Sequence, residues 1–128
     1  MITETVYLHF FNSLTEGNKA ECIRIINEQI ENKIEVKDIY TKLIQRAMYK
    51  IGNLWEKNKT SVAEEHIASN INAALLNILY PHLLKGKKNG KKIVVTCIDK
   101  EFHEMGARIV SDFFEYKGWD SIYLGANT

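Results

Sequence analysis

The sequence predicts a mixed fold, in which an N-terminal antiparallel four-helix bundle is followed by the first βαβ unit of an α/β domain. Apolar residues recur every three or four positions through most of residues 1–84, which is the spacing of amphipathic helices. An unbroken apolar run, 93–98, then precedes a helical pattern and a second short apolar run, as in a parallel βαβ unit. The predicted parts are a bundle (1–84), a linker (85–92) and a partial α/β domain (93–128).

The composition is that of an ordinary globular protein. The 128 residues are 45% hydrophobic and 26% charged, and they suffice for one domain or two very small ones. A net charge of +1 argues against a broad nucleic-acid surface. We find neither a signal-peptide core nor an apolar run of membrane-spanning length, so we expect a cytoplasmic protein without a membrane partner. Cys22 and Cys97 are expected to be buried thiols rather than a disulfide.

Four helices are expected in the bundle. The first ends near Gly17, Asn18 caps the second, and the third runs over 36–57. The fourth begins at Ser61 and continues to about Leu84, because Ser61-Val-Ala-Glu64 is a capping box. Short connections favour antiparallel neighbours. The apolar stripes are, in chain order, Ile2, Val6, Phe10 and Leu14; Ala20, Ile23, Ile26 and Ile30; Tyr40, Leu43, Ala47, Ile51 and Leu54; and Ile67, Ile71, Ala74, Leu75 and Ile78.

The turn between the third and fourth helices carries candidate binding residues. Trp55 ends the third helix, and Glu65 and His66 lie in the first turns of the fourth. A tight turn at Asn58 and Lys59 would bring an indole, a carboxylate and an imidazole to one end of the bundle. The purely structural alternative gives Trp55 a core role, Glu65 a role in stabilising the helix dipole, and His66 a satisfied, partly buried position.

Residues 85–128 resemble part of a nucleotide-type fold. Five lysines and two glycines in 85–92 predict a solvated hinge, with a nucleic-acid patch as the less favoured alternative. The run 93–98 lacks polar alternation, as expected for a strand covered on both faces. Helix 104–116, a stop at Gly118 and a strand at 121–124 complete the first βαβ unit of a Rossmann or flavodoxin-like domain.

Two strands are fewer than a stable sheet of this kind needs. We therefore expect either a truncated or cleaved form of a longer chain, or a partner chain that completes the sheet. A free strand edge beside an apolar strand also favours association. The sequence thus predicts a homo-oligomer, formed through the sheet edge or through the bundle.

His103 is the central candidate for function. It follows the first strand and precedes a helix, so it should lie at the carboxyl edge of the parallel sheet, where open α/β sheets bind ligands. Glu101 is close enough to orient its imidazole. Gly106 would lie in the first helical turn, where a missing side chain lets a bulky group approach. An ordinary surface histidine is an equally good reading of this loop alone.

Read together, Glu101-x-His103-x-x-Gly106 resembles the corrin-binding signature of cobalamin (vitamin B12) proteins, whose commonest form is Asp-x-His-x-x-Gly. The resemblance implies that His103 is the lower axial ligand of cobalt and displaces the cofactor's own dimethylbenzimidazole. It also implies that Glu101 accepts the proton of the other ring nitrogen, which fixes the tautomer. Glu is one methylene longer than the commoner Asp, and Asp99 is an alternative partner.

The spacing of Trp55, nine residues and then Glu65-His66 resembles the helical half of MerR-type cobalamin photoreceptor regulators. In that family the bundle lies over the upper face of adenosylcobalamin, so Trp55, Glu65 and His66 would surround the adenosyl group. The two resemblances follow one another in the family's order and together span about 34–127. The three further strands that line the slot for the displaced nucleotide tail in that family are not in this sequence, so we expect this chain to bind its cofactor weakly or to lack it.

Three functions follow from these resemblances. The first is a sensor module that binds adenosylcobalamin between the bundle and the α/β domain. The second is a corrinoid carrier of a methyltransferase system, which would hold methylcobalamin. The third is a cofactor-free oligomerisation or interaction module. The sequence has neither a separate nucleophile–base set nor a zinc motif, so we expect no catalytic residue, no direct nucleic-acid partner and no turnover by this chain alone.

Overall fold

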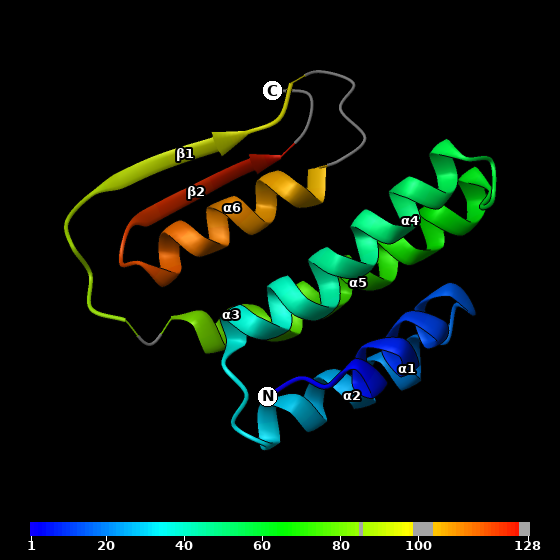
Figure 1. Ribbon diagram of the computed structural model, residues 1–128. Helices are drawn as coiled ribbons and strands as arrows, with labels where there is room; N and C mark the ends of the chain where they lie inside the picture. The colour runs from blue at the N-terminus through cyan, green and yellow to red at the C-terminus, as the bar shows by residue number, and fades with distance from the viewer. Residues whose placement is uncertain (85, 99–103, 126–128) are drawn as a thin grey trace. The chain divides into compact units, whose positions relative to one another are not determined.

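A computed structural model of the protein describes residues 1–84, 86–98 and 104–125. The chain forms two compact units, Met1–Ile78 and Leu79–Thr128. The first is helical, and the second contains two parallel strands and a helix (Figure 1). In chain order, the elements are α1 (Glu4–Thr15), α2 (Lys19–Glu31), α3 (Val36–Ile39), the π-helical segment η1 (Tyr40–Gln45), α4 (Arg46–Glu56), α5 (Val62–Leu83), β1 (Lys92–Thr96), α6 (Glu104–Tyr116) and β2 (Asp120–Gly125). The predicted order of a helical bundle and the start of a parallel α/β domain is confirmed.

The first helix ends, and the second begins, where the sequence predicts. Asn18 caps α2, since its side chain accepts a hydrogen bond from the backbone N–H of Glu21 at 3.2 Å. Gly17 ends α1 with a φ of 73°, in the left-handed region that glycine adopts without steric cost. The buried face of α1 carries Tyr7, Phe10, Phe11 and Leu14. Of the predicted stripe, Phe10 and Leu14 are in the core, whereas Ile2 and Val6 are only half-buried.

The helix α2 ends in a left-handed residue that is not glycine. Lys33 has a φ of 63°, and its N–H donates to the carbonyl of Ile30 at 3.1 Å. The next N–H, of Ile34, donates to the carbonyl of Gln29 at 3.1 Å. This pair of hydrogen bonds is the Schellman motif, in which glycine is the usual residue at the left-handed position. A side chain there costs roughly 1–2 kcal/mol.

Replacing Lys33 with glycine is therefore expected to stabilise the bundle by about 0.5–1 kcal/mol, because the relief of strain exceeds the added entropy of the unfolded chain. Urea unfolding monitored by helical circular dichroism measures the change. Lys37→Gly is the matched control, since Lys37 lies within α3 and glycine in a helix costs about 1 kcal/mol. Destabilisation by Lys33→Gly equal to that of the control would contradict the strain argument.

The predicted third helix is a continuous helical run of three parts, α3, η1 and α4. Tyr40, Leu43 and Ile44 of the π-helical segment are all fully buried. A π-helical turn is wider than an α-helical turn, so it changes which residues face the core. Ala47 and Ile51 are buried as predicted, whereas Leu54 is only half-buried.

The buried face of α5 differs from the predicted stripe. Ile71 and Leu75 are buried as predicted, but Ile67 is 50% exposed. Ala68 and Asn72, each one residue further along, are buried instead. The amide of Asn72 makes no hydrogen bond to any described residue, although the side chain is fully buried. Sequence periodicity missed it because an asparagine interrupts the apolar pattern.

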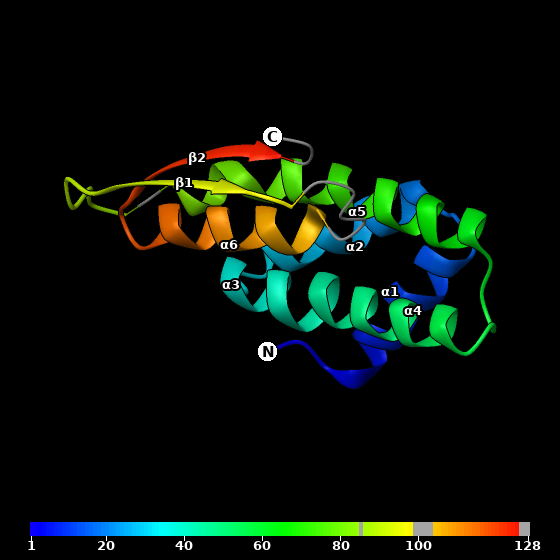
Figure 2. The same ribbon diagram turned by 90° about the horizontal axis from the view of Figure 1, so that it is seen from above.

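The second unit consists of β1 and β2, paired in parallel, with α6 between them in the chain. Figure 2 shows α6 running along one face of the two strands. The hydroxyl groups of Ser111 on α6 and Ser121 on β2 lie 2.7 Å apart on that face. The helix bounds 104–116 and the stop at Gly118 (φ 95°) are as predicted. The prediction that β1 is covered on both faces is wrong for the described residues, because Val94 is 57% exposed.

The described part of the lysine-rich region is hydrogen-bonded to the turn between α6 and β2. The N–H of Asn89 donates to the carbonyl of Gly118 at 2.9 Å, and the N–H of Asp120 donates to the carbonyl of Lys91 at 2.8 Å. A Cβ atom at Gly118 would lie 2.4 Å from the carbonyl oxygen of Lys87. Only glycine allows the two backbones to approach so closely.

Two further sequence expectations concern the helices and the cysteines. No helix within 1–84, 86–98 and 104–125 is both long enough and apolar enough to cross a bilayer. Cys22 and Cys97 are free and buried, as predicted. Burial raises the pKa of the Cys22 thiol to about 11, so this group stays protonated near neutral pH.

Candidate functional site

Two capping motifs fix the turn between α4 and α5. The backbone of Asn58 is in the left-handed conformation (φ 56°), and its N–H donates to the carbonyl of Trp55 at 3.0 Å. This left-handed residue ends α4. The capping box of α5 is confirmed, since Ser61 Oγ accepts from the N–H of Glu64 at 3.1 Å and Glu64 Oε1 accepts from the N–H of Ser61 at 3.0 Å. The second of these bonds is the main cause that holds the pKa of Glu64 below its usual value. The turn is thus defined by local hydrogen bonds on both sides.

This turn joins α4 to α5, so Trp55 at the end of α4 and Glu65 and His66 at the start of α5 lie at the same end of the helical unit (Figure 1). Trp55 is 44% exposed, so the core role that the structural alternative gave it does not hold. The His66 side chain is 57% exposed, whereas that of Glu65 is only 16% exposed. The indole of Trp55 and the imidazole of His66 are therefore both on accessible surface at this end of the unit.

Glu65 orients His66. The Nδ1 atom of His66 lies 2.6 Å from Glu65 Oε2, and Ser69 donates its hydroxyl proton to Glu65 Oε1 at 2.9 Å. Because a carboxylate accepts hydrogen bonds, Nδ1–H of His66 donates to Glu65, and this bond sets the orientation of the ring. Sequence reasoning missed Ser69, although its place four residues after Glu65 on a helix is a usable signal.

Gly106 is the one residue of the predicted corrin-binding signature within the described part of the chain. It lies in the first turn of α6, and a Cβ atom there would meet no heavy atom of the described residues within 4 Å. Open space at this position suits the close approach of a flat group. Glu101 and His103, together with the alternative partner Asp99, lie outside the described residues. Their positions stay a prediction.

The carboxyl edge of the strands carries a small polar cluster that sequence reasoning also missed. The Tyr123 hydroxyl donates to the carbonyl oxygen of Glu104 at 3.1 Å and lies 4.0 Å from Cys97 Sγ. Burial, together with the neighbouring Glu104 carboxyl, raises the pKa of Tyr123. The cluster depends on the pairing of β1 with β2, so no spacing within the sequence reveals it. It ties the start of α6 to the strand ends.

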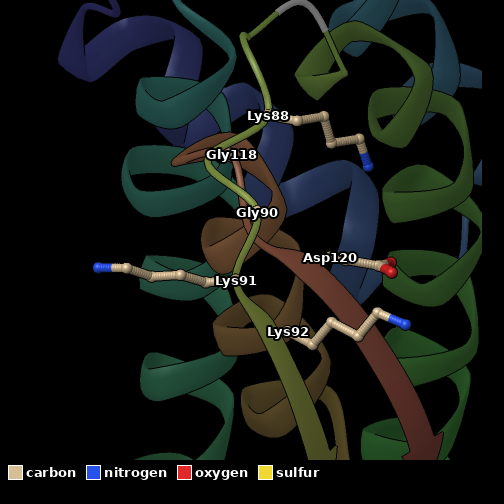
Figure 3. Close-up of a pocket in the computed structure, with 6 residues that line it drawn as sticks. All are labelled: Lys88, Gly90, Lys91, Lys92, Gly118 and Asp120. Carbon is tan, nitrogen blue, oxygen red and sulfur yellow. The ribbon is translucent and has the colours of Figure 1, made fainter.

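A shallow cavity of about 300 Å³ lies at the opposite, amino-terminal edge of the sheet. Three lysines, two glycines and Asp120 line it (Figure 3). Ligands of open α/β sheets bind at the carboxyl ends of the strands. This cavity is therefore separate from the predicted cofactor site.

Comparison with known proteins identifies the helical region. Residues 9–80 match the sequence profile of the B12 binding domain. Monomethylamine corrinoid protein 1 of Methanosarcina acetivorans is 24% identical over 131 aligned positions, which cover 99% of this chain and 60% of that protein. Monomethylamine corrinoid protein 2 of the same organism is 23% identical with the same coverage. The chain thus spans about three fifths of the length of these relatives.

Solved structures show the same fold. The monomethylamine corrinoid protein of Methanosarcina barkeri superposes with a TM-score of 0.84 and 18% identity, over 99% of this chain and 60% of that one. A chain of the methanol:cobalamin methyltransferase complex MtaBC of the same organism gives a TM-score of 0.61 and 12% identity, over 99% of this chain and 49% of that one. The helical unit and the start of the parallel α/β unit therefore have the architecture of the corresponding part of corrinoid proteins.

Proposed function

We propose, since this chain belongs to the B12 binding domain family, that it is the cobalamin-binding part of a corrinoid carrier in a methyltransferase system. The observation that carries the proposal is the match of residues 9–80, which covers nearly all of the helical unit and the α4–α5 turn. The similarity to monomethylamine corrinoid proteins, which extends over 99% of the chain, supports it. In this proposal the chain binds a cofactor and a partner enzyme, and it is not itself a catalyst.

The relatives favour the carrier over the light-responsive sensor that the sequence analysis placed first. The matched proteins are named for monomethylamine and methanol systems, and one of the matched structures is a complex with a methyltransferase. Methylcobalamin is therefore the expected form of the cofactor, and the preference for adenosylcobalamin is withdrawn. The sensor remains the second candidate on one observation, the exposure of Trp55 and His66 at the same end of the helical unit.

The described residues fit a corrinoid. Trp55 offers an exposed apolar face, and His66 offers a ring nitrogen whose orientation Glu65 fixes. At Gly106 no atom of the described residues would obstruct a flat macrocycle at the start of α6. Cobalamin, when bound, supplies a cobalt atom that can hold a methyl group. In our proposal His103 ligates that cobalt from below, while Glu101 accepts the proton of its other ring nitrogen.

The choice of upper ligand separates the two candidates. The protein is mixed with methylcobalamin or adenosylcobalamin in the dark, desalted, and examined by visible absorption before and after illumination. A carrier is expected to retain methylcobalamin at least as well as adenosylcobalamin, and Trp55→Ala should weaken both equally, because the indole then contacts the ring rather than the upper ligand. Retention of adenosylcobalamin alone, with release on illumination, would support the sensor. Retention of neither would favour the cofactor-free module.

A further inference from the structure

The hydroxyl of Tyr123 lies beside residues on both sides of the segment that contains His103. It donates to the carbonyl oxygen of Glu104 at 3.1 Å and lies 4.0 Å from Cys97 Sγ. Cys97 directly follows β1, and Glu104 is the first residue of α6. In the sequence His103 lies between these two residues and directly precedes Glu104. One side chain on β2 therefore joins the end of one element to the start of the next.

The bond from Tyr123 is not needed to satisfy the carbonyl of Glu104. In an α-helix the carbonyl of each residue accepts from the N–H four residues further on, so the N–H of Arg108 is the intrahelical donor to this oxygen. A carbonyl oxygen has a second lone pair, which the hydroxyl uses. Helix ends fray, and a bond from outside the helix to its first turn restrains the end that frays. The hydroxyl thus acts on the position of this turn rather than on the formation of the helix.

The pairing of the two strands is irregular at the same end. Val95 pairs with Tyr123, but the next residue, Thr96, pairs with Gly125, so Leu124 is an extra residue on β2. One extra residue on a strand is the mark of a β-bulge. Bulges change the direction of nearby side chains and are frequent beside functional sites. The end of β2 is therefore shaped locally and does not simply continue the strand.

Gly125 brings this strand end against the start of α6. Its carbonyl accepts from Thr96 Oγ1 at 3.0 Å and from the N–H of Cys97 at 3.1 Å. Its φ is 82°, and a Cβ atom there would lie 2.9 Å from Glu104 Oε1. The ends of both strands and the first residue of α6 are thus held close together at the carboxyl edge, which is the edge where parallel α/β sheets bind ligands.

We propose, resting on the cobalamin-binding function proposed above, that Tyr123 is a positioning residue for the cofactor. Its hydroxyl fixes the backbone at Glu104 and, through the chain, restrains His103, which precedes that residue. Tyr123 itself does not touch the cofactor. A group that ligates a metal must be held within about 0.5 Å of its productive position, and neighbouring hydrogen bonds provide that restraint.

Tyr123→Phe tests the proposal because it removes only the hydroxyl. Equilibrium dialysis of the 128-residue chain against methylcobalamin in the dark is expected to give a dissociation constant about three- to tenfold above that of the wild type, as for the loss of one hydrogen bond. Tyr116→Phe is the matched control, because Tyr116 is at the opposite end of the same helix. The control should bind methylcobalamin as the wild type does.

A double-variant cycle separates positioning from a general loss of stability. If Tyr123 acts through His103, then Tyr123→Phe in a His103→Ala background should change the dissociation constant by less than about twofold. A role in stability alone would weaken binding by the same factor in both backgrounds. That result would overturn the proposal.

Hydrogen exchange of the cofactor-free protein supplies a readout that does not involve cobalamin. In Tyr123→Phe the amides of Arg108 and Ile109, which donate to carbonyls of the first turn of α6, are expected to exchange about three- to tenfold faster, and those near Tyr116 at the wild-type rate. Unchanged exchange in the first turn would overturn the proposal. So would wild-type binding by Tyr123→Phe, which leaves the cobalamin function standing. A wild type that binds no cobalamin overturns that function, and this proposal with it.

Discussion

Replacing Gly118 with alanine is expected to destabilise the unit of β1, α6 and β2 by about 2–4 kcal/mol. Two effects add. The φ of 95° disfavours any side chain, and the new Cβ atom would lie 2.4 Å from the carbonyl oxygen of Lys87 and 3.4 Å from the backbone nitrogen of Asn89. Because both neighbours are backbone atoms, no side-chain rotation relieves the clash. The hydrogen bond between Asn89 and Gly118 should be lost with it.

The chain offers a control that separates the two effects. Gly90 has a similar φ of 81°, but a Cβ atom there meets nothing within 4 Å, so Gly90→Ala should cost only about 1 kcal/mol. In a Trp55→Phe background the remaining indole, Trp119, packs edge-on against Phe114 and reports on this unit alone. Urea unfolding followed by its fluorescence measures both variants. Equal costs for Gly118→Ala and Gly90→Ala would mean that the close approach to Lys87 does not exist.

Replacing His103 with alanine is expected to lower retention of methylcobalamin at least about tenfold and to remove the spectrum of a cofactor whose own dimethylbenzimidazole is displaced. The reason is that the proposed site has one protein ligand for cobalt, and no other histidine is predicted at the carboxyl edge of the sheet. His9→Ala is the control, since His9 lies on α1 and bonds Glu21 at 3.0 Å. Equal retention by the two variants would exclude His103 as the lower ligand.

Local chemistry explains why most of the fold could be predicted. The side chains of Asn18 and Ser61 cap helices, and Gly118 ends a helix because it has no side chain. Each of these helix boundaries can therefore be predicted from a few neighbouring residues. Lys33 could not be recognised as a helix end in the same way. Lysine has no preference for the left-handed conformation, which the adjoining turn imposes on it.

The errors arose where tertiary packing decides. Ile67 fits the apolar stripe but is half exposed, while Asn72 breaks the stripe and is buried, because the neighbouring helices determine which face of α5 is covered. The exposure of Val94 on β1 could not be predicted for a related reason. An apolar strand predicts that both faces are covered, but it does not specify whether the cover comes from the same chain. Such questions depend on contacts between distant segments.

The candidate site divides in the same way. The position of Trp55, Glu65 and His66 at one end of the helical unit could be predicted from spacing, because the turn between them is short and locally capped. Ser69 completes the orientation of His66 from the next helical turn and was overlooked. The cluster of Tyr123, Glu104 and Cys97 required the register of two strands. The resemblance of the sequence motifs predicted cobalamin binding. The proposal of a carrier rather than a sensor rests on the similarity to corrinoid proteins.

The central claim is that a histidine nitrogen of this chain ligates cobalt from below. Electron paramagnetic resonance of the complex with cobalt(II) cobalamin tests it directly, using protein in which only the histidines carry nitrogen-15. The account predicts that the superhyperfine triplets of the unlabelled complex become doublets, and that His103→Ala abolishes this change. Triplets that persist in the labelled protein would mean that dimethylbenzimidazole remains on the cobalt, which would contradict the proposed role of His103.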